Sequence, residues 1–266
     1  MLKLRALLGA LVVALTAGCG GMSAAPTPAV ISELAPAGEL RVAVFTGNPV
    51  IGSKNKSTGE LTGTTVTLGR SLADSAGVPV RLIEYTAVAK MVEDAQAGAW
   101  DVAVVAFDPA RRNVIDFASP HVVVDLTYLI APGATINSAA EVDNPGVRVA
   151  VARGAATALF LERTLKQATL APAENEPAAF QLIKDGKAQA YAQNRYMLLG
   201  LAEGLPGARV VGDRFGDARM CIVLPKGRVA ALAYVNAFVA QAKTSGAVAR
   251  AIADAGLRGV DVAPVE

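Results

Sequence analysis

The sequence predicts an α/β protein in which mixed, mostly parallel sheets are flanked by helices and the chain forms two lobes. From residue 38 onward, apolar segments of strand length alternate with amphipathic segments of helix length, an order typical of parallel sheets with right-handed crossovers. Residues 102–107 form an unbroken apolar run, as expected for a strand that is covered on both faces. This alternating region, roughly 235 residues long, suits two lobes of about 100 residues each.

In the first half of the chain, three strands alternate with two helices, which indicates a parallel sheet. The first helix places Val66, Leu68 and Leu72 on one face, and Gly77 ends it. Strands are predicted at residues 40–45, 80–85, 101–107 and 114–117, and helices at residues 65–76 and 88–97.

A second unit of the same kind begins near Pro132. Gly154 precedes one of its helices and Gly186 follows another. An apolar run at residues 220–224 and two further helices complete the chain. Strands are predicted at residues 147–151, 188–192 and 208–211, and helices at residues 156–166, 178–185, 195–203, 229–245 and 248–255.

The N-terminus has the pattern of a signal peptide. Lys3 and Arg5 precede an apolar core at residues 6–17, which is shorter than the roughly 20 residues that span a membrane. Residues 15–19, Leu-Thr-Ala-Gly-Cys, resemble a bacterial lipobox, which implies cleavage before Cys19 and lipidation of its thiol. The alternative is an ordinary signal peptide in which Cys19 is incidental. We expect residues 20–37 to form a flexible tether, because small residues and prolines are frequent there.

The charge and the rare residues exclude several classes of site. The chain has 25 Lys and Arg and 23 Asp and Glu; removing the predicted lipoprotein signal peptide, residues 1–19, takes away Lys3 and Arg5 and leaves 23 of each. No basic patch argues for nucleic acid as a partner. Cys221 is the only cysteine besides Cys19, so we expect no internal disulfide, and His121 is the only histidine, which argues against a histidine metal cluster or a Ser-His-Asp triad. We expect neither a metal nor a cofactor.

Arg111 is the strongest candidate for a ligand contact. It follows the apolar run at residues 102–107, and in open α/β sheets ligands bind outside the carboxyl ends of the strands. A guanidinium stays charged and can hold a carboxylate through two parallel hydrogen bonds. The alternatives are a solvated arginine or a local ion pair with Asp108, and Arg112 is the competing residue one position later.

Residues 100–120, W-DVAVVAF-DPARR-NVIDFASP, resemble a segment of the family 3 periplasmic solute-binding proteins, the amino-acid-type binding components of ABC importers. Arg111 lies six residues before Phe117, which is the family spacing for the arginine that binds the ligand's carboxylate. Residues 38–44 resemble the family's first strand, and residues 58–63 resemble the turn before its first helix. The resemblance covers about residues 38–256.

The resemblance implies a type II periplasmic-binding-protein fold in which the chain crosses between two lobes twice. The crossings are expected at residues 125–131 and 218–224. The predicted boundaries are residues 38–127 plus 221–258 for lobe 1, 128–220 for lobe 2 and 259–266 for a C-terminal tail.

Two further segments resemble the family's ligand contacts. In relatives a Gly followed by Ser or Thr begins a helix that binds the ligand's carboxylate; here Gly154 is followed by Ala155 and Ala156, with Thr157 one residue later. The backbone part of this anion site would remain, because a helix N-terminus favours anions whatever its side chains. The alternative is an ordinary helix start.

Residues 186–194 resemble the family's G-x-a-D-A-x-x-x-D, whose last Asp receives the ligand's α-ammonium. This sequence has Asn194 there. Because a buried ammonium without a counterion is costly, we expect a ligand that carries a carboxylate and needs no α-amino group. Asp108 or Asp125 could replace the missing charge.

The remaining candidates belong to the cleft walls. Phe45 and Phe107 are possible apolar walls or ordinary core residues, and Asn48 is a polar contact or a turn residue. The predicted ligand-binding residues are Phe45, Asn48, Phe107, Asp108, Arg111, Ala156, Thr157 and Asn194.

The resemblance implies a lipid-anchored extracytoplasmic protein, expected to be a monomer, at the cell surface or in the periplasm. It would capture a small amino acid or organic acid by hinge closure and deliver it to an ABC permease. The alternative is an enzyme on the same scaffold, a dehydratase-like lyase acting on a small cyclic acid, with Glu84, Asp108 and Asp125 as the nearby carboxylates. A binding lobe for signalling is a third class, for which the sequence offers no fused module.

Overall fold

The computed structural model describes residues 25–257 and 259–265. The predicted signal peptide, Cys19 and the first part of the predicted tether lie outside these described residues. Within the described ranges, no helix is both long enough and apolar enough to cross a membrane.

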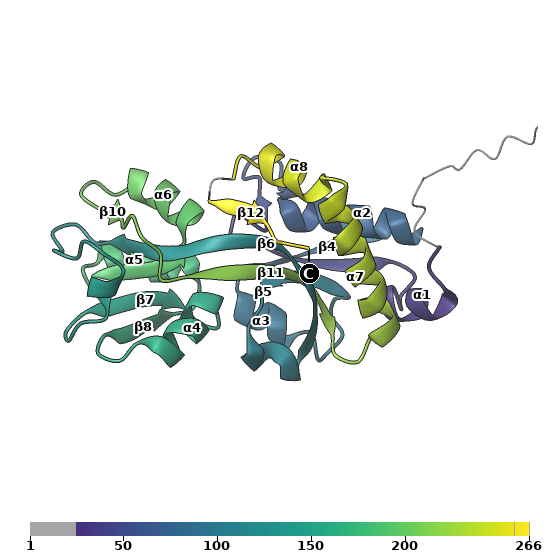
Figure 1. Ribbon diagram of the computed structural model, residues 1–266, viewed down its shortest axis with the longest axis horizontal. Helices are drawn as coiled ribbons and strands as arrows, with labels where there is room; N and C mark the ends of the chain where they lie inside the picture. The colour runs from purple at the N-terminus through teal and green to yellow at the C-terminus, as the bar shows by residue number, and fades with distance from the viewer. Residues whose placement is uncertain (1–24, 258, 266) are drawn as a thin grey trace, which may run out of the picture.

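A ten-stranded mixed sheet runs through the molecule, with helices grouped at its two ends (Figure 1). The strand order is β4-β1-β5-β11-β6-β9-β7-β8, with β10 and β12 paired to β6, and β2 and β3 form a separate hairpin. The strands are β1 (Leu40–Phe45), β2 (Ser53–Lys54), β3 (Leu61–Thr62), β4 (Val80–Tyr85), β5 (Val102–Ala106), β6 (Ile115–Ile130), β7 (Arg148–Ala152), β8 (Thr169–Ala173), β9 (Ala190–Asn194), β10 (Arg209–Val210), β11 (Gly216–Pro225) and β12 (Val260–Val262).

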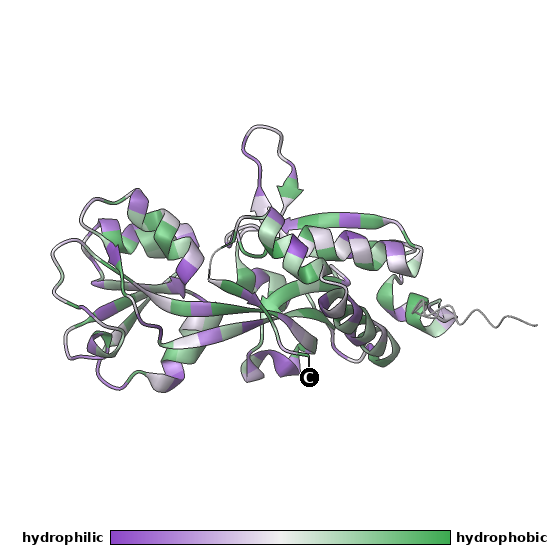
Figure 2. Ribbon diagram, turned by 45° about the horizontal axis from the view of Figure 1, so that its top comes forward, coloured by the Kyte–Doolittle hydropathy of each residue, from purple (hydrophilic) through white to green (hydrophobic). Residues whose placement is uncertain are grey.

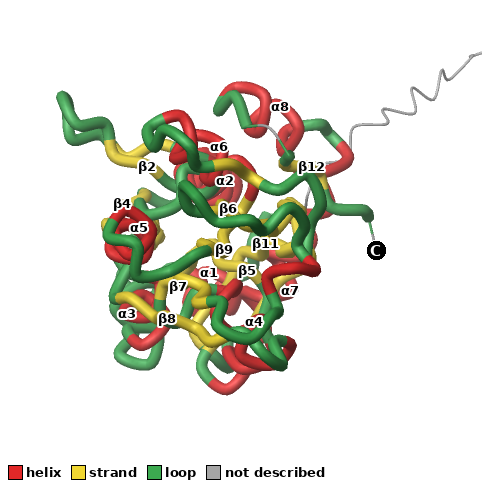
Figure 3. The backbone as a smooth tube through the Cα atoms, turned by 90° about the vertical axis from the view of Figure 1, so that its left-hand side faces the viewer, coloured by secondary structure: helices red, strands yellow, loops and turns green. Residues whose placement is uncertain are grey.

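Helices cover both ends of the sheet. Figure 2 shows apolar residues along the central strands and mixed colours on the helices around them, as expected for amphipathic helices. Figure 3 shows the β2 hairpin projecting from the body. The α-helices are α1 (Pro28–Leu34), α2 (Thr64–Ala76), α3 (Val88–Glu93), α4 (Ala156–Thr164), α5 (Glu176–Lys184), α6 (Arg195–Glu203), α7 (Val229–Thr244) and α8 (Ala247–Asp254), and η1 (Pro109–Asn113) and η2 (Ala140–Val142) are 3₁₀-helices.

The strand directions bring two parallel groups together at their carboxyl ends. β1 pairs in parallel with β4 and β5, and β7 pairs in parallel with β8 and β9. Between them, β11 and β6 are antiparallel to each other, β11 is antiparallel to β5, and β6 is antiparallel to β9. β5 and β9 therefore run in opposite directions from the two ends of the sheet, and their last residues face the same central region.

The buried side chains form one large and two smaller cores. The large core draws mainly on residues 34–126 and 218–260, and the two smaller cores draw on residues 128–211 and 129–198. The change occurs within β6, where Leu126 belongs to the large core and Tyr128 to a smaller one. We propose that the first lobe ends and the second begins between residues 127 and 128, as the sequence predicts, because the core changes there.

Two terminal segments differ from the prediction. The prediction of a flexible tether at residues 20–37 is wrong for residues 28–34, which form α1. Thr27 caps this helix and Leu34 is fully buried. The Glu33 carboxylate accepts a hydrogen bond from the backbone N–H of Ala231. The predicted tail, residues 259–266, is wrong for β12, which pairs with β6. The composition of these segments did not predict α1 or β12, because a few buried aliphatic side chains decide where each segment packs.

Two strands that contain proline, β6 and β8, were not predicted as they occur. The sequence predicts a strand at residues 114–117 and a separate crossing at 125–131, whereas β6 is continuous over both. Pro120 lies where the register between β6 and β11 shifts, so its missing N–H is tolerated there. β8, which contains Pro172, was not predicted; it is an edge strand, where proline is also tolerated.

Candidate ligand-binding site

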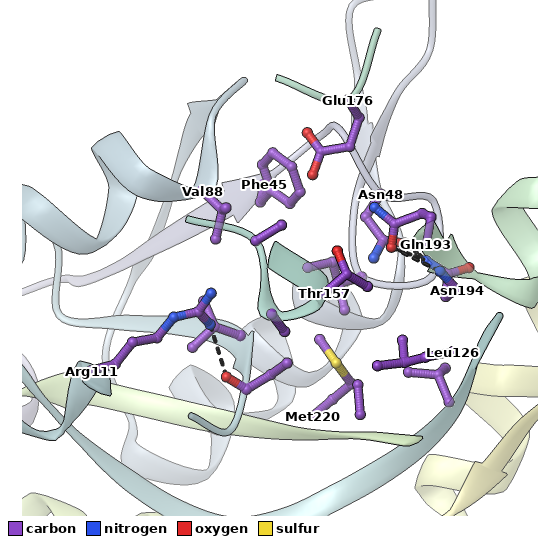
Figure 4. Close-up of a pocket in the computed structure, with 17 residues that line it drawn as sticks. Phe45, Asn48, Val88, Arg111, Leu126, Thr157, Glu176, Gln193, Asn194 and Met220 are labelled. Atoms are coloured by element: carbon purple, nitrogen blue, oxygen red, sulfur yellow. Dashed lines mark hydrogen bonds between the residues drawn. The ribbon is translucent and has the colours of Figure 1, made fainter. Parts of the chain in front are cut away.

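The central region where the parallel strands end contains a cavity of about 50 Å³ (Figure 4). Its apolar walls include Phe45, Ile51, Val88, Val105, Leu126 and Met220, and its polar side chains are Asn48, Arg111, Thr157, Glu176, Gln193 and Asn194. This volume corresponds to a few water molecules, so a solute of amino-acid size requires the walls to move apart.

Arg111 enters the cavity from η1, directly after β5. The Asp108 carboxylate accepts a hydrogen bond from the backbone N–H of Ala110, and Pro109 begins the helix, which fixes the turn that carries Arg111 inward. The Arg111 side chain is buried; Nη1 donates to the carbonyl of Ala106 at 2.8 Å and Nη2 donates to the carbonyl of Gly154 at 2.6 Å. Three of its five N–H groups remain for a ligand.

The charge of Arg111 is not matched by a directly bonded carboxylate among the described residues. Burial lowers the pKa of Arg111 to about 10, although the nearby charge of Asp108 opposes this shift. The guanidinium therefore stays charged at neutral pH in a site with low exposure to water. A solute carboxylate would supply the missing partner.

The N-terminus of α4 lies beside Arg111. Gly154 has a left-handed φ of 69°, and no side chain caps the helix at Ala155. Ala156 and Thr157 line the cavity, and Oγ1 of Thr157 is buried without a hydrogen-bond partner among the described residues. The backbone can therefore favour an anion here, and the Thr157 hydroxyl is available to a solute.

Asn194 is committed to contacts within the protein. Its Oδ1 caps α6 by accepting a hydrogen bond from the backbone N–H of Met197 at 2.9 Å. Its Nδ2 donates to Oδ1 of Asn48 and to Oε1 of Gln193, both at 3.2 Å. This amide cluster forms one wall of the cavity and joins the loop after β1 to the end of β9.

Glu176 also lines the cavity, and the sequence analysis missed it. It is the first residue of α5, its side chain is 2% exposed, and Oε2 has no hydrogen-bond partner in the described part of the chain. Burial raises the pKa of Glu176 to about 7. Asn175 caps α5, and an acidic residue in the first helical turn has an ordinary explanation in the helix dipole, so the local sequence gave no sign of a site.

The cavity brings together six of the eight predicted ligand-binding residues: Phe45, Asn48, Arg111, Ala156, Thr157 and Asn194. The other two are corrected, because Phe107 and Asp108 point elsewhere. Phe107 packs against Phe117 with ring centroids 5.1 Å apart, and both carboxylate oxygens of Asp108 accept hydrogen bonds from Arg163.

The acidic residues considered for an enzyme, or as a replacement countercharge, lie in ion pairs away from the cavity walls. Asp125 pairs with Arg195 and Arg214, and Glu84 pairs with Lys54. Asp108 pairs with Arg163 as described above. Among the residues that line the cavity, Glu176 is the acidic one.

Three contacts cross between the two groups of elements that border the cavity. Arg163 of α4 binds Asp108, Arg111 of η1 binds the carbonyl of Gly154, and Asn194 of β9 binds Asn48. All three would have to lengthen or rearrange if the cavity opened to admit a solute. We call the Arg163–Asp108 ion pair the latch.

Comparison with known proteins gives two relatives that cover most of the chain. The chain is 23% identical over 207 residues to the ABC transporter glutamine-binding protein GlnH of Bacillus subtilis (strain 168), which covers 76% of each chain. It is 22% identical over 183 residues to the glutamine-binding protein of Geobacillus stearothermophilus, covering 67% of this chain and 69% of that one.

Solved structures share the fold. The solute receptor for L-cysteine of Neisseria gonorrhoeae aligns with a TM-score of 0.76 and 22% identity, over 89% of this chain and 99% of that chain. An ancestral amino-acid-binding protein, described as a precursor of cyclohexadienyl dehydratase, aligns with a TM-score of 0.72 and 24% identity, over 84% and 97%. These similarities confirm the predicted periplasmic-binding-protein fold.

A family model matches residues 40–254, most of the region in which the sequence predicted alternating strands and helices. The match spans both groups of strands and the segment that carries Arg111. The chain therefore belongs to the bacterial extracellular solute-binding proteins, family 3.

Proposed function

We propose that this protein is the binding component of an ABC importer and that it captures a small carboxylate-bearing solute of the amino-acid class in the central cavity. The observation that carries the proposal is Arg111, a buried guanidinium with two carbonyl partners and three N–H groups left for a ligand. Family membership and the two glutamine-binding relatives support this class of solute.

In this proposal the solute carboxylate binds between Arg111 and the N-terminus of α4. The guanidinium and the backbone N–H groups at Ala156 and Thr157 both border the cavity. A hydrogen bond to a charged group contributes roughly 1.5–3 kcal/mol. Because the two sets of donors belong to different lobes, a bound carboxylate favours the closed arrangement over an open one.

The same contacts suggest how the lobes close. β6 and β11 are the long strands that connect the two ends of the sheet, so they are the natural place for bending. Closure would form the latch and the Asn48–Asn194 hydrogen bond around the solute. The closed protein would then present the solute to the permease without changing it chemically.

The location of the protein is part of the proposal. We propose an extracytoplasmic monomer, in the periplasm or at the cell surface, held to a membrane by lipid on Cys19. Incorporation of labelled palmitate should depend on Cys19, with Cys19→Ser as the comparison. A wild-type chain that stays unlabelled and free of the membrane would exclude this mode of attachment.

Calorimetric titration with the proteinogenic L-amino acids and with small mono- and dicarboxylic acids tests the central proposal. We expect at least one of these solutes to bind, and Arg111→Ala to weaken its binding by about 100-fold. Arg112→Ala is the matched control, because Arg112 is exposed and lies over the ring of Phe107 outside the cavity. Equal losses in both variants, or none in Arg111→Ala, would contradict the proposal.

A further inference from the structure

We infer that Glu176 selects solutes that carry a cation: its carboxylate binds an ammonium group of the solute while Arg111 binds the carboxylate. The solute is then a zwitterion, and Glu176 on α5 supplies the negative charge that the family pattern places at residue 194. This inference rests on the proposed function and narrows its solute class. It also replaces the expectation, made from Asn194 alone, that an amino group is unnecessary.

The first argument is the position of Glu176. Its Oε2 is buried without a partner among the described residues, and Figure 4 shows its carboxylate directed into the pocket from a different side than Arg111. Gly47 packs closely over it, because a Cβ at residue 47 would lie only 3.0 Å from Oε2 and 2.4 Å from the ring of Phe45. A buried carboxylate with one oxygen that lacks a partner is unfavourable, and a bound cation would relieve this.

The second argument is that the neighbouring oxygens already accept hydrogen bonds. Oδ1 of Asn194 accepts from Met197, and Oε1 of Gln193 accepts from the backbone N–H and Nδ2 of Asn194. Oδ1 of Asn48 accepts from the backbone N–H of Val50 and from Asn194. These amides are also uncharged, so of the groups that line the cavity Glu176 is the one that can neutralise an ammonium.

The third argument is the space on the far side of Glu176. A groove of about 700 Å³ lies between α5, α6 and the loop after β1, and its walls include Gly47, Phe180, Tyr196 and Met197. Glu176 is the lining residue that this groove shares with the cavity. A cation bound at Glu176 would therefore lie next to this larger groove.

The protonation of Glu176 supplies a measurable signature. Burial raises its pKa to about 7, so near pH 7 the free protein holds a proton on part of the molecules. A bound ammonium favours the ionised carboxylate, so binding releases this proton. Arg111 on η1 and Tyr191 on β9 face the same region, and Lys184 of α5 and Glu203 of α6 line the adjoining groove. The pKa of Arg111 is about 10, and burial raises that of Tyr191 above its usual value, so neither contributes near pH 7.

The test compares matched solutes on matched variants. Each L-amino acid that binds is paired with the acid lacking its α-amino group, for example L-glutamine with 4-carbamoylbutanoate. We expect wild type to prefer the cation-bearing member at least tenfold. Glu176→Gln should reduce this preference to about threefold or less and leave the affinity for the acid without an amino group nearly unchanged. Glu174→Gln, an exposed acidic residue on the same segment, should behave as wild type.

The outcomes separate this inference from the proposed function. If no carboxylate solute binds, or if binding survives Arg111→Ala, the proposed function fails and the inference fails with it. If solutes bind through Arg111 but Glu176→Gln keeps the full preference for the cation-bearing member, the inference alone is wrong. Thermal unfolding of each variant shows whether a loss of binding reflects a loss of folding.

A second measurement needs the wild-type protein alone. Calorimetry of the best amino acid at pH 7 in phosphate and in Tris, whose ionisation enthalpies differ, reports the protons released on binding. We expect release of a fraction of a proton with the amino acid and none with its deamino partner. Equal proton release with both solutes, or none with the amino acid, would overturn the inference.

Discussion

Arg111 and Glu176 are opposite charges in one cavity, and the protein treats them differently. Arg111 has two carbonyl partners and is held by a short helix that Asp108 and Pro109 define. Glu176 has an unpaired carboxylate oxygen at the start of an ordinary helix. The comparison indicates that the guanidinium is fixed in advance for an anion, whereas the carboxylate is kept in a costly state that a cation would relieve.

The largest expected effect concerns the stability that the protein loses by burying the Glu176 carboxylate. Glu176→Gln should stabilise the solute-free protein by up to about 3 kcal/mol above pH 7 and by almost nothing near pH 4.5. Burial raises the pKa of Glu176 to about 7 from its ordinary 4.5, so between these values the folded protein holds a proton that the unfolded chain has released. The stability of wild type is therefore complete below pH 4.5, as far as this group is concerned, and falls as the pH rises through 7.

Chemical unfolding of both proteins between pH 4.5 and 8 measures this difference. The comparison with the variant removes the opposite dependence of His121, whose pKa is lowered to about 4 by burial first and by Lys243 second. That histidine costs stability as the pH falls from about 6.5 toward 4, in both proteins alike. A stability difference that does not grow with pH would mean that Glu176 is not buried and unpaired in solution.

Solute binding at Arg111 should depend on the geometry of the guanidinium as well as on its charge. Arg111→Lys keeps a positive charge but loses the planar fork, so we expect a loss of solute affinity of about 30-fold, or roughly 2 kcal/mol. Arg112→Lys is the control. Titration of the same solute into both variants checks this expectation, and unchanged affinity in Arg111→Lys would mean that the arginine acts only as a point charge.

Moving the negative charge should sharpen the comparison further. In the double variant Glu176→Gln with Asn194→Asp, the countercharge shifts from α5 to the end of β9. We expect its preference for the cation-bearing solute to lie between that of Glu176→Gln, about threefold or less, and that of wild type, about tenfold or more. The recovery is partial because Asn48 and Gln193 now point oxygens at residue 194. A double variant no better than Glu176→Gln would show that a charge at residue 194 does not reach the solute.

The smallest expected effect concerns the latch. Arg163 is about half exposed at the side chain, at 49%, whereas Asp108 is 3% exposed, so the ion pair is partly screened by water. Arg163→Gln should weaken solute binding by about two- to fivefold, which corresponds to roughly 0.5–1 kcal/mol. Lys166→Gln is the exposed control, two residues beyond the end of α4. Small-angle scattering with saturating solute should still show a smaller radius of gyration than without it, and an unchanged radius in wild type would argue against closure.

The sequence predicted one end of the cavity and missed the other for a physical reason. Arg111 follows an apolar strand at the spacing that the family uses, so local sequence identifies it. Glu176 matters because the loop around Gly47, far away in the chain, packs over it and excludes water. No local pattern reports this burial, because an acidic residue after an Asn cap is common at helix starts.

The fold shows the same limit. Strands such as β1 and β5 have continuous apolar runs and were predictable from the sequence, whereas β8 and the middle of β6 contain prolines that read as breaks. Their pairing partners tolerate those prolines, at an edge and at a register shift respectively. Contacts with residues distant in sequence therefore determine whether these segments form strands, just as they determine the burial of Glu176.

A crystal structure of the wild-type protein with its best-binding amino acid tests the central claim most directly. The account predicts the solute carboxylate within about 3 Å of the Arg111 guanidinium nitrogens and its ammonium within about 3 Å of a Glu176 carboxylate oxygen. A solute whose ammonium binds at Asn194 while Glu176 contacts no part of it, or a solute bound outside this cavity, would contradict the account.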